Sequence, residues 1–557
     1  MSTPFHDLTP RLDPLRHKGT GPVRTQRPLY ANLLAPCNGA CPAGEDIQGW
    51  LALAQAGKFE KAWTKLVEAN PLPGVHGRVC YHPCETSCNR AELDSAVSIH
   101  GVERFLGDMA VAQGWQVALP ADSRKRVLVI GAGPAGLSAA YHLRRYGHAV
   151  EIQEAAAQPG GMMHYGIPAY RLPRAELQQE IDRITALGVK LTLNCPVTDV
   201  AAARAAGNFD AVFIAIGTQI GKRIEIPGRD AGRMLTAVSL LHAAADGAPV
   251  KLGRRVAVYG AGNTAMDAAR TARRLGAEEA VIVFISDRAH MEAHAFEAQE
   301  ALDEGVTIKW LSSIHQVDPG RLQLELMALD ANGKPQPTGQ FETLKADAVV
   351  LALGQQADSG FLHALDGVMF RSDGSVAVDA TLMTGAPGVF AGGDLVPGER
   401  TVTVATGHGR RAAGYIDAWL GGGVRPPPKP AAATATFDML NLPIYADAAR
   451  ASQAELAAAR RVAGFDEVMA GLSQASAQRE AQRCLSCGNC FECDNCYAAC
   501  PEDAIEKLGP RLGYRILLNA CTGCTICVDQ CPCHAMQMVP EPVAEPAAKP
   551  IVAEVTP

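Results

Sequence analysis

Hydrophobic and polar positions follow two rhythms along the chain, and each rhythm predicts a different kind of element. Between residues 47 and 67 the apolar side chains recur at helical spacing, which predicts a small helical domain. From Arg126 a buried-strand run leads into a glycine-rich turn and a helix, and the same order returns near Arg255. Strand, turn and helix repeated in this way are typical of doubly wound α/β units. The positions at helical spacing are Ile47, Leu51, Leu53, Phe59, Trp63, Leu66 and Val67.

The composition excludes several classes of protein. A chain of 557 residues is too long for one hydrophobic core and predicts three or four domains. The net charge of −7 is mild for this size and argues against a nucleic-acid surface. No apolar run approaches the roughly 20 residues of a membrane span, and the first residues lack the apolar core of an export signal. The 17 cysteines are therefore expected in a reducing, cytoplasmic setting, where they indicate metal or redox chemistry.

Eight of these cysteines form two copies of one spacing, C-x2-C-x2-C-x3-C-P, near the C-terminus. This is the pattern of bacterial two-cluster ferredoxins, in which the fourth cysteine of each run binds the cluster of the other run. Zinc sites favour paired CxxC or mixed Cys/His sets, and disulfide frameworks belong to short secreted chains. We therefore predict two [4Fe-4S] clusters here, in a chain that transfers single electrons. The predicted ligands are Cys490, Cys493, Cys496, Cys500, Cys521, Cys524, Cys527 and Cys531.

Two glycine fingerprints predict two nucleotide sites. The first, GAGPAG, follows a buried strand and opens a helix, and a second strand then ends in an acidic residue that suits a ribose hydroxyl. The second, GAGNTA, lies in the same context. We predict FAD at the first and a nicotinamide nucleotide at the second, because a late GGD motif typically closes over FAD. The FAD residues are Gly131, Gly133, Gly136, Glu154, Gly393 and Asp394, and those for NAD(P) are Gly260, Gly262, Asn263, Thr264 and Ala265.

Several segments together resemble the small subunit of glutamate synthase and its relatives, including the NADPH-oxidising half of dihydropyrimidine dehydrogenase. They are GAGPAGLSAA, GGMMHYGIPAYRLP, AIGT with Gly217, GAGNTAMDAARTARRLGA and VFAGGD. The resemblance covers roughly residues 35–420. It implies the fold of FAD/NAD(P)-linked disulfide reductases without their redox disulfide, and it implies that Asp394 meets the ribityl chain. The residues that it places along the flavin are Gly161, Met162, Gly166 and Ile167.

The chain departs from this family where the 2′-phosphate of NADPH is gripped. The family has a Tyr-Arg-Arg run after the second strand of that unit, whereas this chain has an acid, Asp287, followed by Arg288. An acid there suits a free 2′-hydroxyl and repels a phosphate. Arg288, or Arg273 with Arg274, offers an alternative grip for NADPH. The choice between NADH and NADPH stays open at this point.

The N-terminal cysteines are five in number, an awkward count for clusters that need four ligands each. In the resembled family a leader ending in RCLxC stands before the first CxxxCP loop, whereas here it follows the linker and carries Cys484 and Cys487. If this segment folds back, two N-terminal clusters can form, with Glu103 standing where dihydropyrimidine dehydrogenase has Gln. The alternative is that Cys484 and Cys487 are spare, which leaves one N-terminal cluster. The ligand sets are Cys37, Cys88, Cys484 and Cys487, and then Cys41, Cys80, Cys84 and Glu103; Cys195 and Cys533 have no assigned role.

The predicted fold class is α/β, with two Rossmann-type units between a helical Fe–S domain and a ferredoxin-like α+β domain. The predicted boundaries are an N-terminal arm, 1–34; the helical Fe–S domain, 35–120; the FAD-binding domain, 121–245 and 350–423; the NAD(P)-binding domain, 246–349; a linker and helical segment, 424–482; the ferredoxin-like domain, 483–540; and a disordered tail, 541–557.

The predicted function is electron transfer between NAD(P)H, FAD, [4Fe-4S] clusters and ferredoxin or a catalytic partner subunit. Nothing in the chain resembles a separate substrate-converting domain, which favours a subunit of a larger complex. Residues 488–539 carry six acidic and three basic residues, so a modestly basic partner is expected. One alternative is the small subunit of a glutamate synthase, although the ferredoxin module counts against it. Another is a non-catalytic redox scaffold, which the two intact glycine fingerprints disfavour.

Overall fold

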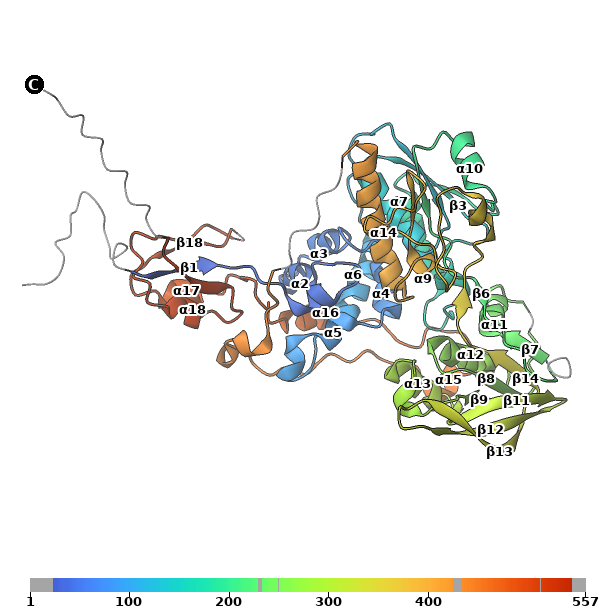
Figure 1. Ribbon diagram of the computed structural model, residues 1–557. Coiled ribbons are helices and arrows are strands. Elements are labelled where there is room, and N and C mark those ends of the chain that lie inside the picture. Colours follow the sequence, from blue (N-terminus) through green and yellow to red (C-terminus); the bar gives the residue numbers. More distant parts are fainter. Residues whose placement is uncertain (1–23, 229–232, 249, 424–431, 511, 543–557) are drawn as a thin grey trace, which may run out of the picture.

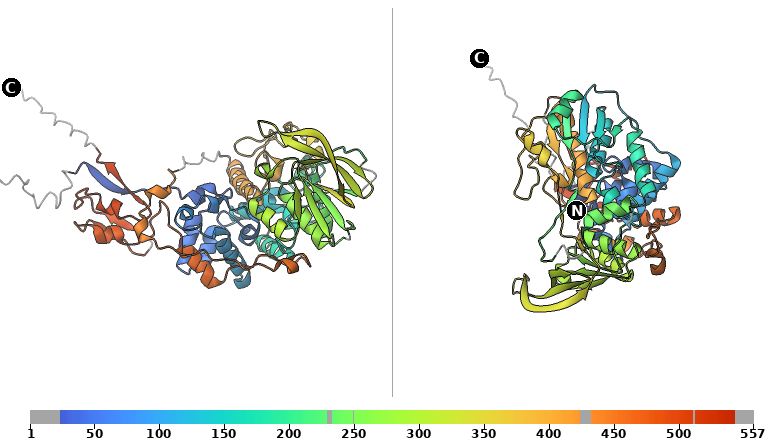
Figure 2. Two further views of the ribbon diagram at one scale, coloured as in Figure 1. Left: turned by 90° about the horizontal axis from the view of Figure 1, so that it is seen from below. Right: turned by 90° about the vertical axis from the view of Figure 1, so that its right-hand side faces the viewer.

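The computed structural model describes residues 24–228, 233–248, 250–423, 432–510 and 512–542. A ferredoxin-like module, a helical domain and a pair of α/β units follow one another from end to end of the molecule (Figures 1 and 2). Most of the predicted arm and tail, and residues 424–431 of the predicted linker, lie outside the described residues. Within the described part of the chain, we find no helix that is both long enough and apolar enough to cross a membrane.

The first α/β unit is built on a five-stranded parallel sheet in the order β16-β5-β2-β3-β4. Its central strand β2 (Arg126–Ile130) is almost wholly buried, because helices cover one face of the sheet and the largely irregular segment 361–396 packs on the other. The long helix α14 (Val402–Leu420) packs against α7 (Pro134–Arg145). The other elements are β3 (Ala149–Gln153), α8 (Met162–Tyr165), α9 (Arg174–Thr185), β4 (Lys190–Thr192), α10 (Val200–Ala206), β5 (Ala211–Ile214) and β16 (Val389–Ala391).

The second α/β unit has its own five-stranded parallel sheet, in the order β10-β9-β8-β14-β7. A three-stranded antiparallel sheet, β11-β12-β13, shares a hydrophobic core with it. The chain passes between the two units at a short antiparallel pair, β6 (Ile220–Gly221) with β15 (Gln355–Gln356). The elements are β7 (Arg233–Thr236), α11 (Ala237–Ala245), β8 (Arg255–Tyr259), α12 (Asn263–Arg274), β9 (Glu279–Val283), α13 (Ala295–Asp303), β10 (Thr307–Lys309), β11 (Ser312–Asp318), β12 (Arg321–Leu329), β13 (Pro335–Lys345) and β14 (Ala348–Leu351).

The helical domain combines two segments that are far apart in the sequence. Helix α16 (Gln474–Gln482), which ends just before Cys484, packs against the N-terminal helices α2 and α6 (Figure 1). Between the linker and α16 the chain is mostly irregular, with one short α-helix, α15 (Ala458–Arg461), and two 3-10 helices, Phe437–Met439 and Leu442–Ile444. The N-terminal helices are α1 (Pro36–Ala40), α2 (Ile47–Gln55), α3 (Phe59–Leu66), α4 (Pro73–Val79), α5 (Pro83–Thr86) and α6 (Ile99–Gln113).

The ferredoxin-like module is closed by a strand from the beginning of the chain. Strand β1 (Gln26–Tyr30) pairs antiparallel with β19 (Met536–Pro540) over five residue pairs. The ring of Tyr30 also lies against that of Tyr514, with centroids 6.3 Å apart. The module is thereby tied to the helical domain at both of its ends. Its other elements are α17 (Asn495–Ala499), β17 (Ile505–Lys507), β18 (Tyr514–Ile516) and α18 (Ile526–Asp529).

Candidate cofactor sites

A cavity of about 810 Å³ opens at the carboxyl ends of the strands of the first α/β unit. Its size lies in the range of sites for large organic cofactors. The turn after β2 needs glycine, because Gly131 has a φ of +105° and a Cβ on Gly136 would lie 1.9 Å from the Gly131 carbonyl oxygen. The backbone can therefore approach a pyrophosphate at the start of α7. The predicted FAD residues that line this cavity are Gly131, Gly133, Glu154, Gly161, Met162, Gly166, Ile167, Gly217, Gly393 and Asp394.

Two acidic side chains of this cavity are held in place. The Glu154 carboxylate, which follows β3, accepts hydrogen bonds from the backbone N–H groups of Ala132 (2.7 Å) and Ala156 (2.8 Å). Asp394 lies between α14 and the first sheet, and burial raises its pKa to about 6. Next to it, the Gly393 N–H donates to His408 Nδ1 at 3.1 Å, and burial lowers the pKa of His408 to about 4. A neutral imidazole is therefore the acceptor in this contact at neutral pH.

The second glycine turn meets the same cavity from the other unit. Asn263 and Thr264, at the start of α12, line it together with the FAD residues. The Asn263 carboxamide oxygen accepts from the His294 N–H at 2.9 Å, so the segment before α13 is fixed beside the turn. The other predicted residues of the turn, Gly260, Gly262 and Ala265, flank these two. The two fingerprints thus face one space, as a transfer between two nucleotides requires.

The three arginines that were candidates for binding the 2′-phosphate of NADPH differ in their surroundings. Arg274 is buried in an ion pair with Glu304, and Arg273 donates to the carbonyl oxygens of Ala277 and Glu278 at the end of α12. Arg288 is exposed beside Asp287. Asp287 itself lies 2.6 Å from His290 Nδ1, and this contact keeps its pKa low. Only Arg288, of the three arginines, is left at the predicted 2′-position.

The structure brings Cys484 and Cys487 to the N-terminal cysteines. Cys37, Cys88, Cys484 and Cys487 line one small pocket between α1, α5 and the end of α16. Burial raises the pKa of Cys37, and the charges of the other three thiols add to the effect. Four soft sulfur ligands around one enclosed space fit a [4Fe-4S] cluster.

A second group of thiols lies next to the first. Burial and the nearby charge of Glu103 raise the pKa of Cys80 to about 12, and the same carboxylate faces Cys41 and Cys84. Glu103 accepts a hydrogen bond from Asn70 (2.6 Å). Sequence reasoning missed Glu45, a second buried carboxylate at this place, which also accepts from Asn70 (3.1 Å) and whose pKa burial raises to about 7.

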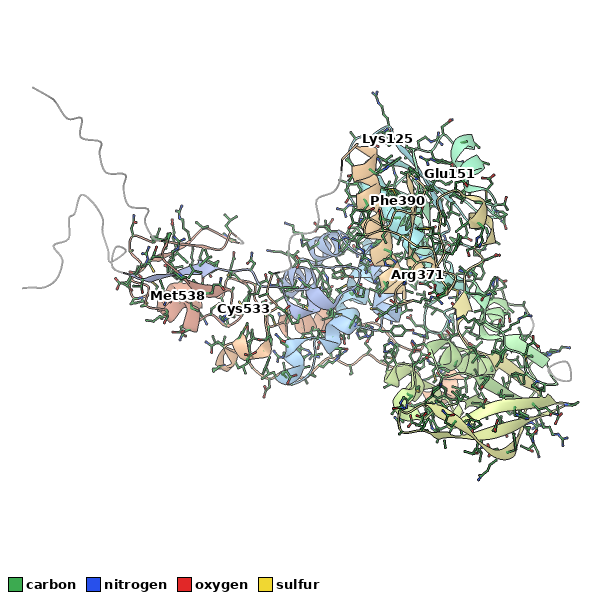
Figure 3. All side chains as sticks on the ribbon, in the orientation of Figure 1. Lys125, Glu151, Arg371, Phe390, Cys533 and Met538 are labelled. Atoms are coloured by element: carbon green, nitrogen blue, oxygen red, sulfur yellow. The ribbon has the colours of Figure 1, made fainter. Side chains whose placement is uncertain are left out.

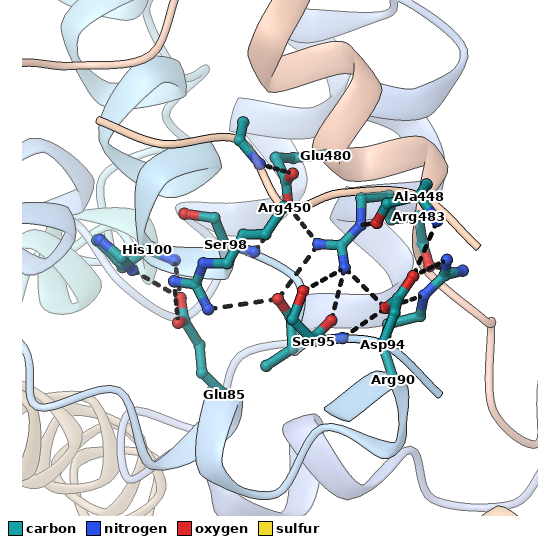
Figure 4. A network of polar contacts seen from close by, with 12 residues as sticks. Glu85, Arg90, Asp94, Ser95, Ser98, His100, Ala448, Arg450, Glu480 and Arg483 are labelled. Carbon is teal, nitrogen blue, oxygen red and sulfur yellow. Dashed lines mark hydrogen bonds and ion pairs between the residues drawn. The ribbon is translucent and has the colours of Figure 1, made fainter. Parts of the chain in front are cut away.

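We call the segment that carries α16, Cys484 and Cys487 the fold-back segment. A buried polar network holds it against the N-terminal part of the helical domain (Figure 4). The Arg483 guanidinium donates to Asp94 and Glu480, both at 2.9 Å, and to the Ser95 carbonyl oxygen at 2.6 Å. Glu480 in turn accepts from the Ser98 N–H at 2.9 Å. Arg483 and Glu480 are 2% and 0% exposed as side chains, so their charges depend on one another. This network positions Cys484, the residue that follows Arg483.

In the ferredoxin-like module the two runs interleave. One pocket is lined by Cys500 of the first run together with Cys521, Cys524 and Cys527 of the second. The reciprocal set is Cys490, Cys493, Cys496 and Cys531, whose charges act on one another. The Tyr30 hydroxyl lies 3.3 Å from Cys496 Sγ. Both donor sets fit the crossed ligation predicted from the spacing.

Direct contacts join the cavity to the cysteines of the helical domain, and the helical domain to the ferredoxin-like module. Cys80 contacts Thr403, next to the cavity-lining Thr401 and Val402. At the other end of the helical domain, the Gly488 N–H donates to the Cys533 carbonyl oxygen at 2.6 Å. Figure 3 shows Cys533 on the side of the ferredoxin-like module that faces the helical domain. Cys533 Sγ lies 3.9 Å from Cys531 Sγ, so this contact leads directly into the first set of the module.

Sequence motifs missed several residues of the cavity. Tyr81, Arg171 and Asp267 line it from the helical domain, the first unit and the second unit respectively, and Cys195 lines it as well. The YRLP segment of the resembled family, which contains Arg171, was one available signal. Asp267 lies in the quoted segment GAGNTAMDAARTARRLGA, which was a second signal, whereas no local pattern marked Tyr81.

Comparison with known proteins agrees with this geometry. The family described as pyridine nucleotide-disulphide oxidoreductase matches residues 125–409, which is more than half of the chain. The chain belongs to this family. Residues 24–115 also match the family described as dihydropyrimidine dehydrogenase domain II, 4Fe-4S cluster. The protein is therefore an NAD(P)H-dependent oxidoreductase with FAD and iron–sulfur cofactors.

Three curated relatives are named as subunits or chains of enzymes that use NADP(+) or NADPH. The NADP(+)-dependent formate dehydrogenase subunit beta of Moorella thermoacetica is 38% identical over 81% of this chain and 70% of its own length. The NADPH-Fe(3+) oxidoreductase subunit beta of Geobacter sulfurreducens is 33% identical over 81% and 75%. The glutamate synthase [NADPH] small chain of Escherichia coli is 31% identical over 69% and 88%. All three are subunits or chains of larger enzymes by name, which agrees with the resemblance drawn from the sequence.

Proposed function

We propose that this pyridine nucleotide-disulphide oxidoreductase takes reducing equivalents from NAD(P)H and delivers single electrons to a partner protein through its ferredoxin-like module. A bound flavin accepts hydride and releases electrons one at a time, and iron–sulfur clusters carry single electrons. The chain itself binds these cofactors, orients them and fixes their order. No proton-transferring side chain is required for the hydride step.

The observation that carries the proposal is the row of sites described above. The two glycine turns face one cavity, and Cys80 lies beside the wall of that cavity. The set containing Cys484 follows, then the set containing Cys531, and last the set containing Cys524. We propose that each set holds one [4Fe-4S] cluster, four in all, because sixteen ligands then match four donor sets. The α14 wall and the Arg483 network keep neighbouring sets in fixed order.

The outer end of the row suits a protein partner. Cys524 is exposed, as are Glu502 and Asp503 near its pocket, and the apolar Ile526 follows it. An exposed cluster ligand among acidic and apolar side chains fits a modestly basic protein surface. We propose that this partner is a ferredoxin or a catalytic subunit, and that the chain works in the cytoplasm as part of a complex.

A second candidate is the small subunit of a glutamate synthase, which the 31% identical relative supports. The ferredoxin-like module counts against it. Co-purification of tagged protein from its native cells distinguishes the two, because a glutamate synthase would be recovered with an amidotransferase-bearing large subunit.

The experiment that tests the proposal is an acceptor comparison on one variant. Cys521→Ser with Cys524→Ser removes two ligands of the outer set only. We expect NAD(P)H-dependent reduction of a small dye to persist, because the cavity is untouched, and reduction of a protein acceptor to be lost. Undiminished reduction of the protein acceptor would show that the module is not the outlet.

A further inference from the structure

We propose that Arg171 is a positioning residue that fixes the second α/β unit against the first at the place where the two nucleotides meet. The inference rests on the function proposed above. It concerns a contact between the two units, which the chain otherwise connects through the short β6–β15 pair. Connections of this kind act as hinges unless the interface is held by further contacts.

One guanidinium reaches two helices of the second unit. Arg171 lies in the loop before α9 of the first unit, and its Nη1 donates to Asp267 Oδ2 on α12 at 2.7 Å. Its Nη2 pairs with Glu297 on α13. The side chains of Arg171, Asp267 and Glu297 are 10%, 8% and 1% exposed. Buried charges such as these have no water to replace a lost partner, so the pairing resists separation of the units.

The preceding residue enlarges the same contact. Tyr170 is fully buried, and its hydroxyl lies 3.3 Å from Asp267 Oδ1. The guanidinium carbon of Arg274 lies 3.7 Å from the centre of its ring, and that of Arg270 lies 4.7 Å away. Both arginines are held by Glu304. The Tyr170–Arg171 pair is thus inserted between α12 and α13 as one plug.

The plug lies at the reacting end of the cavity. Arg171 and Asp267 line the cavity together with Ile167, which is predicted along the flavin. Asp267 stands one helical turn after Asn263, at the start of α12, where the second nucleotide is predicted. A shift of the second unit at this point would change the distance between the two nucleotides. Displacements of about 1 Å can slow such a reaction about a hundredfold.

A neighbouring aromatic contact also joins the units, but it does not reach α12 or α13. The ring of Tyr165, which is buried, lies 4.2 Å from that of His242 on α11, whose side chain is exposed. A third segment also holds the plug, because the Val468 N–H donates to the Tyr170 carbonyl oxygen at 2.9 Å. Val468 belongs to the segment that leads to α16 and Cys484.

The test uses Arg171→Met in the full-length holoprotein, with FAD content checked first. In anaerobic rapid mixing, we expect FAD reduction at saturating NADH or NADPH to fall about 10- to 100-fold, while nucleotide affinity changes less. Dye oxidation of chemically reduced protein should keep its wild-type rate. Arg171→Lys should recover part of the loss. The matched control is Arg183→Met, which removes an ion pair with Glu180 and a hydrogen bond to the Pro71 carbonyl oxygen and leaves the second unit untouched.

Hydrogen–deuterium exchange tests, without any turnover, whether the Tyr170–Arg171 plug holds the second unit in place. Amides of α12 and α13 should exchange faster in Arg171→Met, and in the isosteric Asp267→Asn, than in the wild type or in Arg183→Met. Wild-type exchange together with wild-type FAD reduction in Arg171→Met would overturn the inference. If α12 and α13 exchange faster in Arg171→Met, but neither NADH nor NADPH reduces the FAD of the wild type, the role of the plug stands and the proposed function is refuted.

Discussion

The backbone N–H of Gly488 donates to the carbonyl oxygen of Cys533 at 2.6 Å, and this single hydrogen bond joins two of the predicted cluster sites. Gly488 follows Cys487, whose thiol belongs to the helical domain's pocket. Cys533 stands two residues after Cys531, whose thiol belongs to the ferredoxin-like module. The contact shows why the fold-back segment matters: it carries two ligands and also leads directly into the module.

Replacing Cys484 and Cys487 by Ser should remove one cluster and leave the module intact. The two thiols face Cys37 and Cys88, so the loss should be about four iron and four sulfide per chain, by our ligand assignment. Chemical analysis and electron paramagnetic resonance of anaerobically purified protein measure this. If the signals of the ferredoxin-like module vanish instead, the assignment is wrong; if nothing is lost, the thiols are spare.

Arg483→Met should loosen the fold-back segment. The change leaves buried Glu480 without its cation, which costs about 3–5 kcal/mol in buried pairs, while Asp94 keeps its ion pair with Arg90. Limited proteolysis between residues 432 and 483 and the midpoint of thermal unfolding report the effect. Arg460→Met is the control, because that side chain is 72% exposed and its ion pair with Asp466 spans 4.0 Å. Equal behaviour of the two variants would refute the role of the network.

NADH should be at least competitive with NADPH as a reductant. Asp287 stands at the predicted 2′-position, and Arg273 and Arg274 are committed to other partners. Asp287→Arg should shift the ratio of rates toward NADPH by about ten- to a hundredfold, because a charge-assisted hydrogen bond contributes about 1.5–3 kcal/mol. Flavin bleaching by each nucleotide measures the ratio. A strong NADPH preference in the wild type would contradict the argument from Asp287.

The stability of the FAD-free protein should depend on Asp394. Its pKa in the folded chain is raised by burial to about 6, so folding favours the protonated form. The stability that this group contributes is full below its unfolded pKa of about 4 and is lost as the pH rises through 6. Asp394→Asn should therefore flatten the pH dependence of unfolding between pH 4 and 7. Denaturant titrations of the FAD-free protein over this range test it, and an unchanged slope would count against it.

Much of the fold could be predicted because its signals are local. The strand–glycine–helix order around Gly131 and Gly260 specifies the α/β units, and the cysteine spacing specifies the ferredoxin-like module. The return of Cys484 to Cys37 followed from counting ligands. The Arg171 plug and the pairing of β1 with β19 could not be predicted, because both join residues that are distant in the sequence. The burial of Arg274 against Glu304 likewise depends on tertiary contacts.

The central claim is that one row of four cluster sites connects the nucleotide cavity to the ferredoxin-like module. The most direct measurement mixes NAD(P)H anaerobically with the wild type and with Cys484→Ser/Cys487→Ser, and follows FAD and the module's iron–sulfur signals separately. We expect the wild type to reduce both, and the variant to reduce FAD at the wild-type rate while its module stays oxidised. Reduction of the module at the wild-type rate in a variant shown to lack that cluster would contradict the account.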